Sequence, residues 1–590
     1  MLGLQSLFGV RFAWALGIVA AIGLGLSPAA ARSTQESDPQ LQISEGFSLL
    51  GSYLAGRVAS RDKNLEAAAE YYRRALTRDP DNADMLGEAF KAELGAGNMR
   101  EAVRLARRLT AAGGSEYGFA YLLLGTDAFK RGDYAEAERL FRTVGDSPII
   151  QLTDRLALAW TQFARGRKAQ AIDTLSVTQS ADRSQYFQHM HMALASDLAG
   201  RPDDARDLFE RAFERHNTNR RLIQAYARHA AVRGDDALVK EILGPYQSGD
   251  GADRGLRALY AELRGTDEPE LLVTNAREGL AEVYFGIGAV LSSEQAAAVS
   301  RFYLQLALYL RPEFNRAYYL LGEIETRDQR LEAGLEAYRS VAASSALYLD
   351  ARIRGAFILN ALERSDEGIG MLTAMVADYP EEPRLLQAIG NILRDEEEYA
   401  QAARYYDQAI QIIGEPDPEH WLYYYARGIC YERMKVWDKA EVDLQKALEL
   451  NPDQASVMNY LGYSWVDQNM HLEKAMDLIR EAVRREPNNG YYVDSLGWAY
   501  YRLGQFEKAV KQLEKAVELR PEDPILNDHL GDAYWKVGRK REARFQWSHA
   551  LSLDPEPEDR KEILDKLANG LQDDVNKKAE LGEAGAANMQ

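Results

Sequence analysis

The strongest constraint on the fold is a spacing of about 34 residues that recurs along most of the chain, because self-similarity at such a period is typical of an array of repeated units. In DSLGWAYYRLGQFEKAV (494–510), Gly497 and Ala509 stand twelve residues apart within apolar and aromatic stretches. Gly531 and Ala543 repeat that interval one period later. At 590 residues the chain is also too long for one hydrophobic core.

Each unit carries one small residue in its second half and another about twelve residues upstream, where Phe90 is the sole large exception. In sequence numbers, the steps between successive units run from 32 to 38, apart from one jump of 63. The small residues of the second halves are Ala68, Ala102, Ala137, Ala171, Ala205, Ala237, Ser300, Gly334, Gly368, Ala402, Ala440, Ala475, Ala509 and Ala543.

The pattern within a unit predicts two antiparallel helices. Apolar residues recur three and four apart in both halves, as they do on one face of a helix. A turn such as YRLGQF joins the halves, and its Gly504 suits the left-handed conformation that ends a helix. Two helices approach closely where one side chain is nearly absent, which explains Gly or Ala facing Ala. One hairpin cannot bury its apolar face alone, so the units must stack.

Two regions depart from the repeat. The jump of 63 falls on residues 244–280, where GPYQSGDGADRG and RGTDEPE are turn signals. This segment is either a hinge or a degenerate repeat, and we expect the latter. After the last unit, Ile563, Leu567 and Leu571 share one helical stripe, which predicts a capping helix. The remaining tail is rich in Ala, Gly, Glu and Lys and is expected to be disordered.

The N-terminus has the pattern of a secretory signal. Arg11 precedes an apolar run over 12–26, and Ala29-Ala30-Ala31 is a cleavage motif, which predicts a cut after Ala31. The alternative is an uncleaved membrane anchor over 7–26. We therefore expect an exported, periplasmic protein, with membrane association as the alternative. The expected organisation is a signal peptide (1–31), a linker (32–41), an N-terminal array (42–248), an irregular or degenerate repeat (249–280), a C-terminal array (281–555), a capping helix (556–575) and a disordered tail (576–590).

Composition and motifs argue against several classes of function. The net charge of −19 disfavours binding to nucleic acid or to anionic lipid. No phosphate-binding loop, nucleophile elbow or HExxH zinc motif occurs. His189 and His191 are two residues apart and face different sides of a helix. The single cysteine, Cys430, is expected to be a buried small hydrophobe. We predict no catalytic residue, no metal site and no cofactor.

The order of Leu-Gly, Tyr, Ala, Phe and Pro at a period of 34 resembles the tetratricopeptide repeat (TPR) over about residues 49–555, most strongly in the last five units. The resemblance implies an all-α fold, a right-handed solenoid of about fourteen helix-turn-helix repeats with a C-terminal capping helix. In that family the first helix of each repeat lines a concave groove that binds extended peptides or partner domains.

Carrying that groove face onto the last units gives a candidate protein-binding site of aromatic residues interleaved with acids. Such a groove suits apolar and basic side chains. The alternative is that half of these side chains pack between adjacent first helices. A clamp for C-terminal carboxylates, which the family forms with Lys and Asn, is absent here. The candidate residues are Tyr425, Asn459, Tyr460, Tyr463, Asp494, Trp498, Tyr501, Asp528, Asp532 and Trp535.

The resemblance implies a non-catalytic scaffold or adaptor that binds other proteins. DSLGWAYYRLG followed by NDHLGDAYWKVGR is similar to TPR proteins of the bacterial envelope, some of which are adaptors of C-terminal-processing proteases or assembly factors. One alternative is a membrane-anchored envelope assembly factor. Another is an enzyme with a site in 244–287, which would depend on acids such as Asp267 and Glu268.

Overall fold

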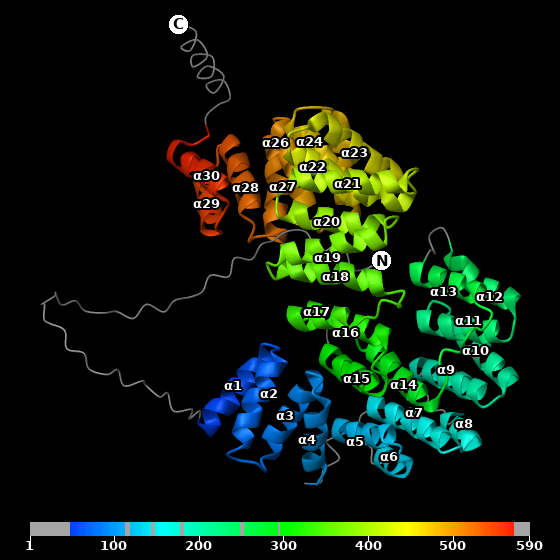
Figure 1. Cartoon of the computed structure of the whole chain (residues 1–590). Helices are drawn as coiled ribbons and strands as arrows, with labels where there is room; N and C mark the ends of the chain where they lie inside the picture. The colour runs from blue at the N-terminus through cyan, green and yellow to red at the C-terminus, as the bar shows by residue number, and fades with distance from the viewer. Residues whose placement is uncertain are drawn as a thin grey trace, which may run out of the picture. The chain divides into compact units, whose positions relative to one another are not determined.

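The computed structural model describes residues 48–111, 118–142, 148–176, 182–247, 253–292 and 296–571. The predicted signal peptide (1–31), linker (32–41) and tail (576–590) lie outside these residues. The described part of the chain is helical, with turns and irregular connections between the helices, and the predicted all-α repeat array is confirmed (Figure 1). Within it, no helix is both long enough and apolar enough to cross a membrane.

The helices up to the end of the irregular segment are α1 (Leu49–Arg61), α2 (Leu65–Leu76), α3 (Ala83–Gly95), α4 (Met99–Ala111), α5 (Gly118–Lys130), α6 (Tyr134–Phe141), α7 (Pro148–Ala164), α8 (Lys168–Ser176), α9 (Asp182–Leu198), α10 (Pro202–His216), α11 (Arg220–Val232), α12 (Asp236–Leu243) and α13 (Arg254–Gly265). They are followed by α14 (Ala276–Val290), α15 (Ala297–Leu310), α16 (Asn315–Arg327), α17 (Leu331–Arg339) and α18 (Tyr348–Ala361).

The remaining helices are α19 (Ser365–Asp378), α20 (Pro383–Asp395), α21 (Tyr399–Ile413), α22 (Trp421–Arg433), α23 (Trp437–Leu450), α24 (Ala455–Asp467), α25 (Leu472–Arg485), α26 (Gly490–Arg502), α27 (Phe506–Leu519), α28 (Pro524–Lys536), α29 (Lys540–Ser552) and α30 (Pro557–Asn569). Short 3-10 turns, η2 (Gly244–Tyr246) and η5 (Pro418–His420), precede α13 and α22.

All of these α-helices except α13 and α30 fall into fourteen consecutive pairs, as the period predicts. Thirteen of the fourteen small residues in the second helices are buried. Ala237 is the exception, because it lies exposed on α12. Val239, which follows Ala205 by one full period, takes the buried place in that repeat. The assignment of Ala237 to the helix contact was therefore wrong by two residues.

Local chemistry fixes where the helices begin and end. The side chain of Asn82 accepts a hydrogen bond from the backbone N–H of Met85 at the start of α3. Asp523 does the same for Leu526 at the start of α28, where Pro524 occupies the first helical position. Gly504 follows α26 with φ +71°, so the predicted left-handed turn is present.

The glycines of the first helices stand where aromatic or aliphatic side chains of the second helices cross them. A Cβ atom added to Gly531 would lie 2.4 Å from Nε1 of the buried Trp547. Real Cβ atoms do not come this close, so an alanine would push the indole out of its packed position. Gly370 on α19 has no neighbouring atom within 4 Å of the same added Cβ and provides a matched control.

We expect Gly531→Ala to lower the free energy of unfolding by about 1–3 kcal/mol because the site is overpacked. Gly370→Ala should instead be neutral or stabilise by up to about 1 kcal/mol, since alanine favours a helix. Urea unfolding followed by tryptophan fluorescence measures both, because Trp421, Trp437 and four further tryptophans lie after residue 368. Equal midpoints for the two variants would contradict the close approach.

The chain divides into two compact units, one ending at Gly368 and one beginning at Ile369, and we describe each by itself as unit 1 and unit 2. The irregular segment lies within unit 1. It contains the single helix α13, which packs against α11 and α12, and residues 266–275 that form no helix. Asp267 and Glu268 lie exposed in this connection.

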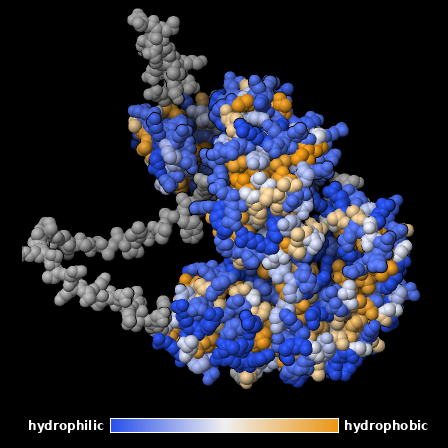
Figure 2. All heavy atoms as spheres, in the orientation of Figure 1, coloured by the Kyte–Doolittle hydropathy of each residue, from blue (hydrophilic) through white to orange (hydrophobic). Residues whose placement is uncertain are grey.

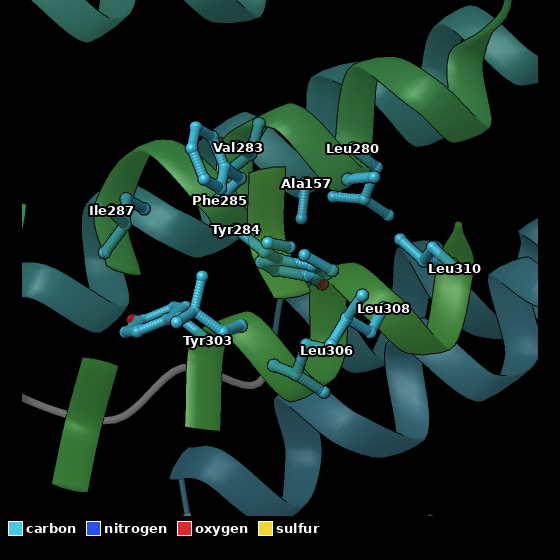
Figure 3. Packing of buried hydrophobic residues seen from close by; sticks show 14 of the residues in the cluster. Ala157, Leu280, Val283, Tyr284, Phe285, Ile287, Tyr303, Leu306, Leu308 and Leu310 are labelled. Carbon is cyan, nitrogen blue, oxygen red and sulfur yellow. The ribbon is translucent and has the colours of Figure 1, made fainter. Parts of the chain in front are cut away.

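In unit 1 the next helix pair, α14–α15, packs across the first helices of earlier repeats. Helix α14 contacts α7 and α9, and α15 contacts α3 and α5. Figure 3 shows Tyr284 of α14 and Tyr303 of α15 within this core, beside Ala157 of α7. Because α3, α5, α7 and α9 are all first helices, the face that would bind a partner in these repeats is covered by the chain itself.

Two hydroxyl contacts fix the α14–α15 pair on this face. Thr126 donates to the carbonyl of Leu122, so the Tyr284 hydroxyl donates to Thr126 Oγ at 2.6 Å. In the same way Thr153 donates to the carbonyl of Ile149, and the Tyr303 hydroxyl donates to Thr153 Oγ at 2.8 Å. Both contacts are buried, which satisfies hydroxyl groups that would otherwise destabilise the core.

Charged groups join the first repeat to α15–α17 within unit 1. We call Lys63, Glu66, Arg301, Glu325, Asp328 and Arg330 the charged seam. Lys63 Nζ lies 2.6 Å from Asp328, and Arg330 lies 2.6 Å from Glu66. Arg301 reaches both Glu325 and Asp328 at 2.7 Å. Every member therefore has an opposite charge within reach.

Candidate functional site

The ten predicted site residues lie on α22, α24, α26 and α28, which are the first helices of four successive repeats in unit 2. The structure buries Tyr425, Asp494 and Asp532 between neighbouring helices. The other seven are half-buried: Asn459, Tyr460, Tyr463, Trp498, Tyr501, Asp528 and Trp535. Figure 2 shows that hydrophobic and hydrophilic residues are interspersed on the face of the molecule in view. Some of the ten predicted residues thus pack between helices and others are accessible, and their role as a binding site stays a prediction.

Six of the residues form what we call the aromatic strip: Tyr425, Tyr460, Tyr463, Trp498, Tyr501 and Trp535. The rings of Tyr425 and Tyr460 meet edge to face at 5.9 Å. Trp498 stacks on Tyr501 of its own helix at 4.7 Å. Rings held by stacking lose little conformational freedom on binding, which favours their use as anchors for apolar side chains of a partner.

The middle of the strip is held by a buried acid and a histidine. Nδ1 of His529 on α28 lies 3.0 Å from both carboxylate oxygens of Asp494 on α26. The imidazole also stacks on Trp498 with ring centroids 4.1 Å apart. Burial alone would lower the pKa of His529, but Asp494 and the nearby Asp528 and Asp532 raise it above its ordinary value. His529 is therefore a partner that this chain itself supplies to the carboxylate of Asp494.

The two other acids share one cation of the capping helix. Lys566 Nζ of α30 lies 2.6 Å from Asp528 and 3.0 Å from Asp532. Trp547 Nε1 donates a further hydrogen bond to Asp532 at 2.9 Å. Burial opposes the charge on Lys566, yet the two carboxylates raise its pKa. Asp494, Asp528 and Asp532 thus bind groups of this chain, which corrects their assigned role as partners for basic side chains.

At the other end of the strip the polar groups are those of Tyr460, Glu432 and Asn459. The hydroxyl of Tyr460 donates to Glu432 at 3.0 Å, and burial raises the pKa of this tyrosine. Oδ1 of Asn459 is buried, and no donor reaches it within the described part of the chain. Tyr463, beside them, is half-buried. This end of the strip thus combines aromatic surface with a polar atom that can accept a hydrogen bond.

Sequence reasoning did not find His529, Glu432 or Lys566. His529 follows Asp494 by one period of 34 residues plus one. An alignment of adjacent first helices that allows a shift of one residue would have paired His529 with Asp494. Lys566 follows Asp532 by one period, but it lies on the capping helix, outside the repeats that were compared.

Other candidate chemistry lies elsewhere. Cys430 is buried, as expected, and burial raises the pKa of its thiol to about 12. His191 is also buried; it accepts a hydrogen bond from Trp160 Nε1 at 3.2 Å, and burial lowers its pKa to about 3. Among the described residues no three His, Cys, Asp or Glu side chains gather as metal ligands would.

Four segments of the chain match family models of the tetratricopeptide repeat. A model described as TPR repeat matches residues 497–538. Models described as tetratricopeptide repeat match residues 421–454, 52–82 and 385–418. Matches thus occur in both units. Two of them cover α22, the last six residues of α26 and all of α28, which together carry Tyr425, Trp498, Tyr501 and Trp535 of the aromatic strip.

Curated relatives match parts of the chain. The TPR repeat-containing protein PA4667 of Pseudomonas aeruginosa is 27% identical over 192 residues, which cover 32% of this chain and 31% of that protein. The Lipoprotein NlpI homolog of Haemophilus influenzae is 30% identical over 84 residues, covering 14% of this chain and 26% of that protein. The matched part therefore spans less than a third of either relative.

Solved structures are similar at low sequence identity. The Cut9 and Hcn1 hetero-tetramer of APC/C is 13% identical with a TM-score of 0.38, and the match covers 88% of this chain and 96% of that one. YrrB, described as a TPR protein with an unusual peptide-binding site, is 19% identical with a TM-score of 0.26 over 32% of this chain and 94% of that one.

Proposed function

The chain is a tetratricopeptide repeat protein, and from this premise we propose that it is a non-catalytic scaffold that binds other proteins through the aromatic strip of unit 2. Partners present peptide segments or domain surfaces with apolar side chains to Tyr463, Trp498 and Tyr501. The observation that carries the proposal is the stack of Trp498 on Tyr501 on α26, next to the half-buried Tyr463 of the preceding first helix α24.

The chemistry of the strip favours apolar over basic partner groups. Asp494 pairs with His529, while Asp528 and Asp532 share Lys566. A cation from a partner would have to compete with these groups for the carboxylates. An apolar side chain needs only to remove water from rings that are already held in place. Asn459 Oδ1 adds one acceptor for a backbone or side-chain N–H of the partner.

We place this function in the bacterial cell envelope. The support is the secretory pattern over 1–31 and partial similarity to bacterial proteins, of which one is named a lipoprotein homolog. An adaptor for a C-terminal-processing protease and an assembly factor are two forms of the role. A mature protein that begins at Arg32 would support export with cleavage, whereas an intact N-terminus would favour an anchor over 7–26.

The proposal is tested by affinity purification of the full chain from its own cells. The double variant Trp498→Ala and Tyr463→Ala should lose partners, because truncating a central aromatic residue weakens binding by at least about 2 kcal/mol, roughly 30-fold. The matched control is Val442→Ala with Phe545→Ala, which removes two exposed side chains, 65% and 68% accessible, from second helices of the same unit.

The control should keep the wild-type partner set. Tryptophan fluorescence during urea unfolding shows whether each variant is folded before purification. An unchanged partner set for a folded Trp498→Ala and Tyr463→Ala variant would rule out the aromatic strip as the binding site.

A further inference from the structure

Unit 1 contains a cavity of about 980 Å³ whose residues no part of the proposed function uses. On one side it is bounded by the turns after α1 and α3, at 62–64 and 95–97. On the other side lie α15, α16 and α17. Its volume is at the upper end of the range of about 300–1,000 Å³ for ligand sites in proteins. Four members of the charged seam lie in its lining: Lys63, Glu66, Glu325 and Arg330.

The wall formed by α15–α17 is largely apolar. Leu308 and Leu321 lie beside the half-buried Tyr309 and Tyr318 along this wall. The hydroxyl of Tyr309 donates to Asp127 at 2.9 Å, which fixes its ring. Lys130 Nζ stands 3.7 Å from the centre of the same ring. A partner would therefore meet an apolar surface whose shape is already set.

One carboxylate beside the cavity has no cationic partner in the part of the chain that the structure describes. Five carboxylates line it, Asp62, Glu66, Glu325, Glu332 and Glu336. Glu66 and Glu325 both pair with Arg330, Asp62 pairs with Arg61, and Glu332 pairs with Arg364. Within the described residues, no hydrogen bond or ion pair reaches the carboxylate of Glu336, which is exposed on α17. This carboxylate favours a basic group in an occupant.

We propose that this cavity is a second protein-binding site, which takes a peptide segment of a partner that carries apolar side chains and a basic residue. The apolar side chains pack on Leu308, Tyr309 and Leu321, and the basic residue pairs with Glu336. Both this proposal and the proposed function of the aromatic strip assume a protein partner, and they share nothing else. Because the cavity and the aromatic strip use different residues in different units, either site can fail without the other.

The probe is a short fluorescein-labelled peptide of alternating leucine and lysine pairs, and its twin has glutamate in place of every lysine. Fluorescence anisotropy with the full chain should show binding of the lysine peptide and little binding of the twin. Ala333→Trp, which fills the cavity from α17, should abolish binding. Glu336→Lys should weaken it about three- to tenfold, because an ion pair becomes a repulsion.

Two controls separate this site from general attraction to an acidic protein. Glu518→Lys makes the same charge change at an exposed position of α27 in unit 2 and should leave the affinity unchanged. The Trp498→Ala and Tyr463→Ala variant should also bind the lysine peptide normally. If Ala333→Trp disturbs folding, Glu336→Lys still tests the site, because the side chain of Glu336 is exposed and its replacement should leave the fold intact. No binding to the wild type, or equal weakening by Glu336→Lys and Glu518→Lys, would overturn the proposal.

Discussion

Replacing Arg301 by methionine is expected to lower the free energy of unfolding of unit 1 by about 3 kcal/mol. The Arg301 side chain is only 5% exposed, and it binds Glu325, which is 3% exposed, together with Asp328. Removing the guanidinium leaves a buried carboxylate short of one partner. The expected loss is at the lower end of the usual range because Arg330 still contacts Glu325 at 2.8 Å.

The measurement is urea unfolding of the full chain labelled with 5-fluorotryptophan, followed by fluorine NMR. Trp160 is the only tryptophan between residues 48 and 368, so its signal reports on unit 1. Arg206→Met is the matched control, since Arg206 pairs with Glu210 and Asp235 at the surface, where ion pairs contribute little to stability. If both variants unfold at the same urea concentration, the charged seam does not hold unit 1 together.

A second substitution distinguishes the loss of a partner from the loss of packing. Adding Glu325→Leu to Arg301→Met removes the buried carboxylate that the first change leaves short of a partner. Apolar side chains of similar volume can replace a buried ion pair with little loss of stability. We therefore expect the double variant to recover part of the stability. A further drop would show that shape, and not charge, dominates at this position.

The repeat could be predicted from the sequence because it depends on local contacts. Each small residue of a second helix meets the first helix of its own hairpin, so the period of the sequence records the contact directly. Even the error at Ala237 is local, since Val239 restores the register within the same helix. The small residue recurs in each of the fourteen repeats, so one wrongly assigned position does not change the predicted period.

The covering of unit 1 by α14–α15 could not be predicted in this way. The contact between Thr126 and Tyr284 joins residues 158 apart, and that between Thr153 and Tyr303 joins residues 150 apart. A first helix has the same apolar pattern whether its outer face meets water or a later helix of the chain. The period therefore predicts the apolar pattern of a first helix. It does not predict whether the outer face of that helix meets water or is covered by a later helix of the chain.

The same limit explains the candidate site. The aromatic residues of unit 2 were identified because aromatic and acidic types stand out at groove positions of successive repeats. Their partners, His529 and Lys566, come from neighbouring helices at other registers. Whether an acid such as Asp494 is available to a partner depends on those neighbours. Residue type therefore selects candidate residues on four first helices and does not predict which of their charges are already paired.

Asp154 gives the second large effect, because its carboxyl group is buried where α14–α15 cover α7. Its residue is 5% exposed, and within the described residues no hydrogen bond or ion pair reaches the carboxyl. The nearby hydroxyls of Tyr284 and Tyr303 donate their protons to Thr126 and Thr153 instead. Burial raises the pKa of Asp154 from 3.8 to about 8. The folded state therefore holds this carboxyl protonated at neutral pH.

The sign of the pH dependence follows from this shift. Between pH 3.8 and about 8, the folded state keeps a proton on Asp154 that the unfolded state releases. The stability of unit 1 should therefore fall as the pH rises through this window, by up to about 1.4 kcal/mol per pH unit. This is the reverse of the usual behaviour of an ion-paired aspartate, whose contribution is lost as the pH falls.

We expect Asp154→Asn to stabilise unit 1 at pH 8 and to make little difference near pH 4, because the amide has nearly the same shape and cannot ionise. The difference in free energy of unfolding between variant and wild type, taken from the Trp160 signal at several pH values, isolates this one group from all other titrations. Asp207→Asn, at an exposed position of α10, should give a flat difference. A flat difference for Asp154→Asn as well would mean that water reaches its carboxyl and that α14–α15 do not seal this face of α7.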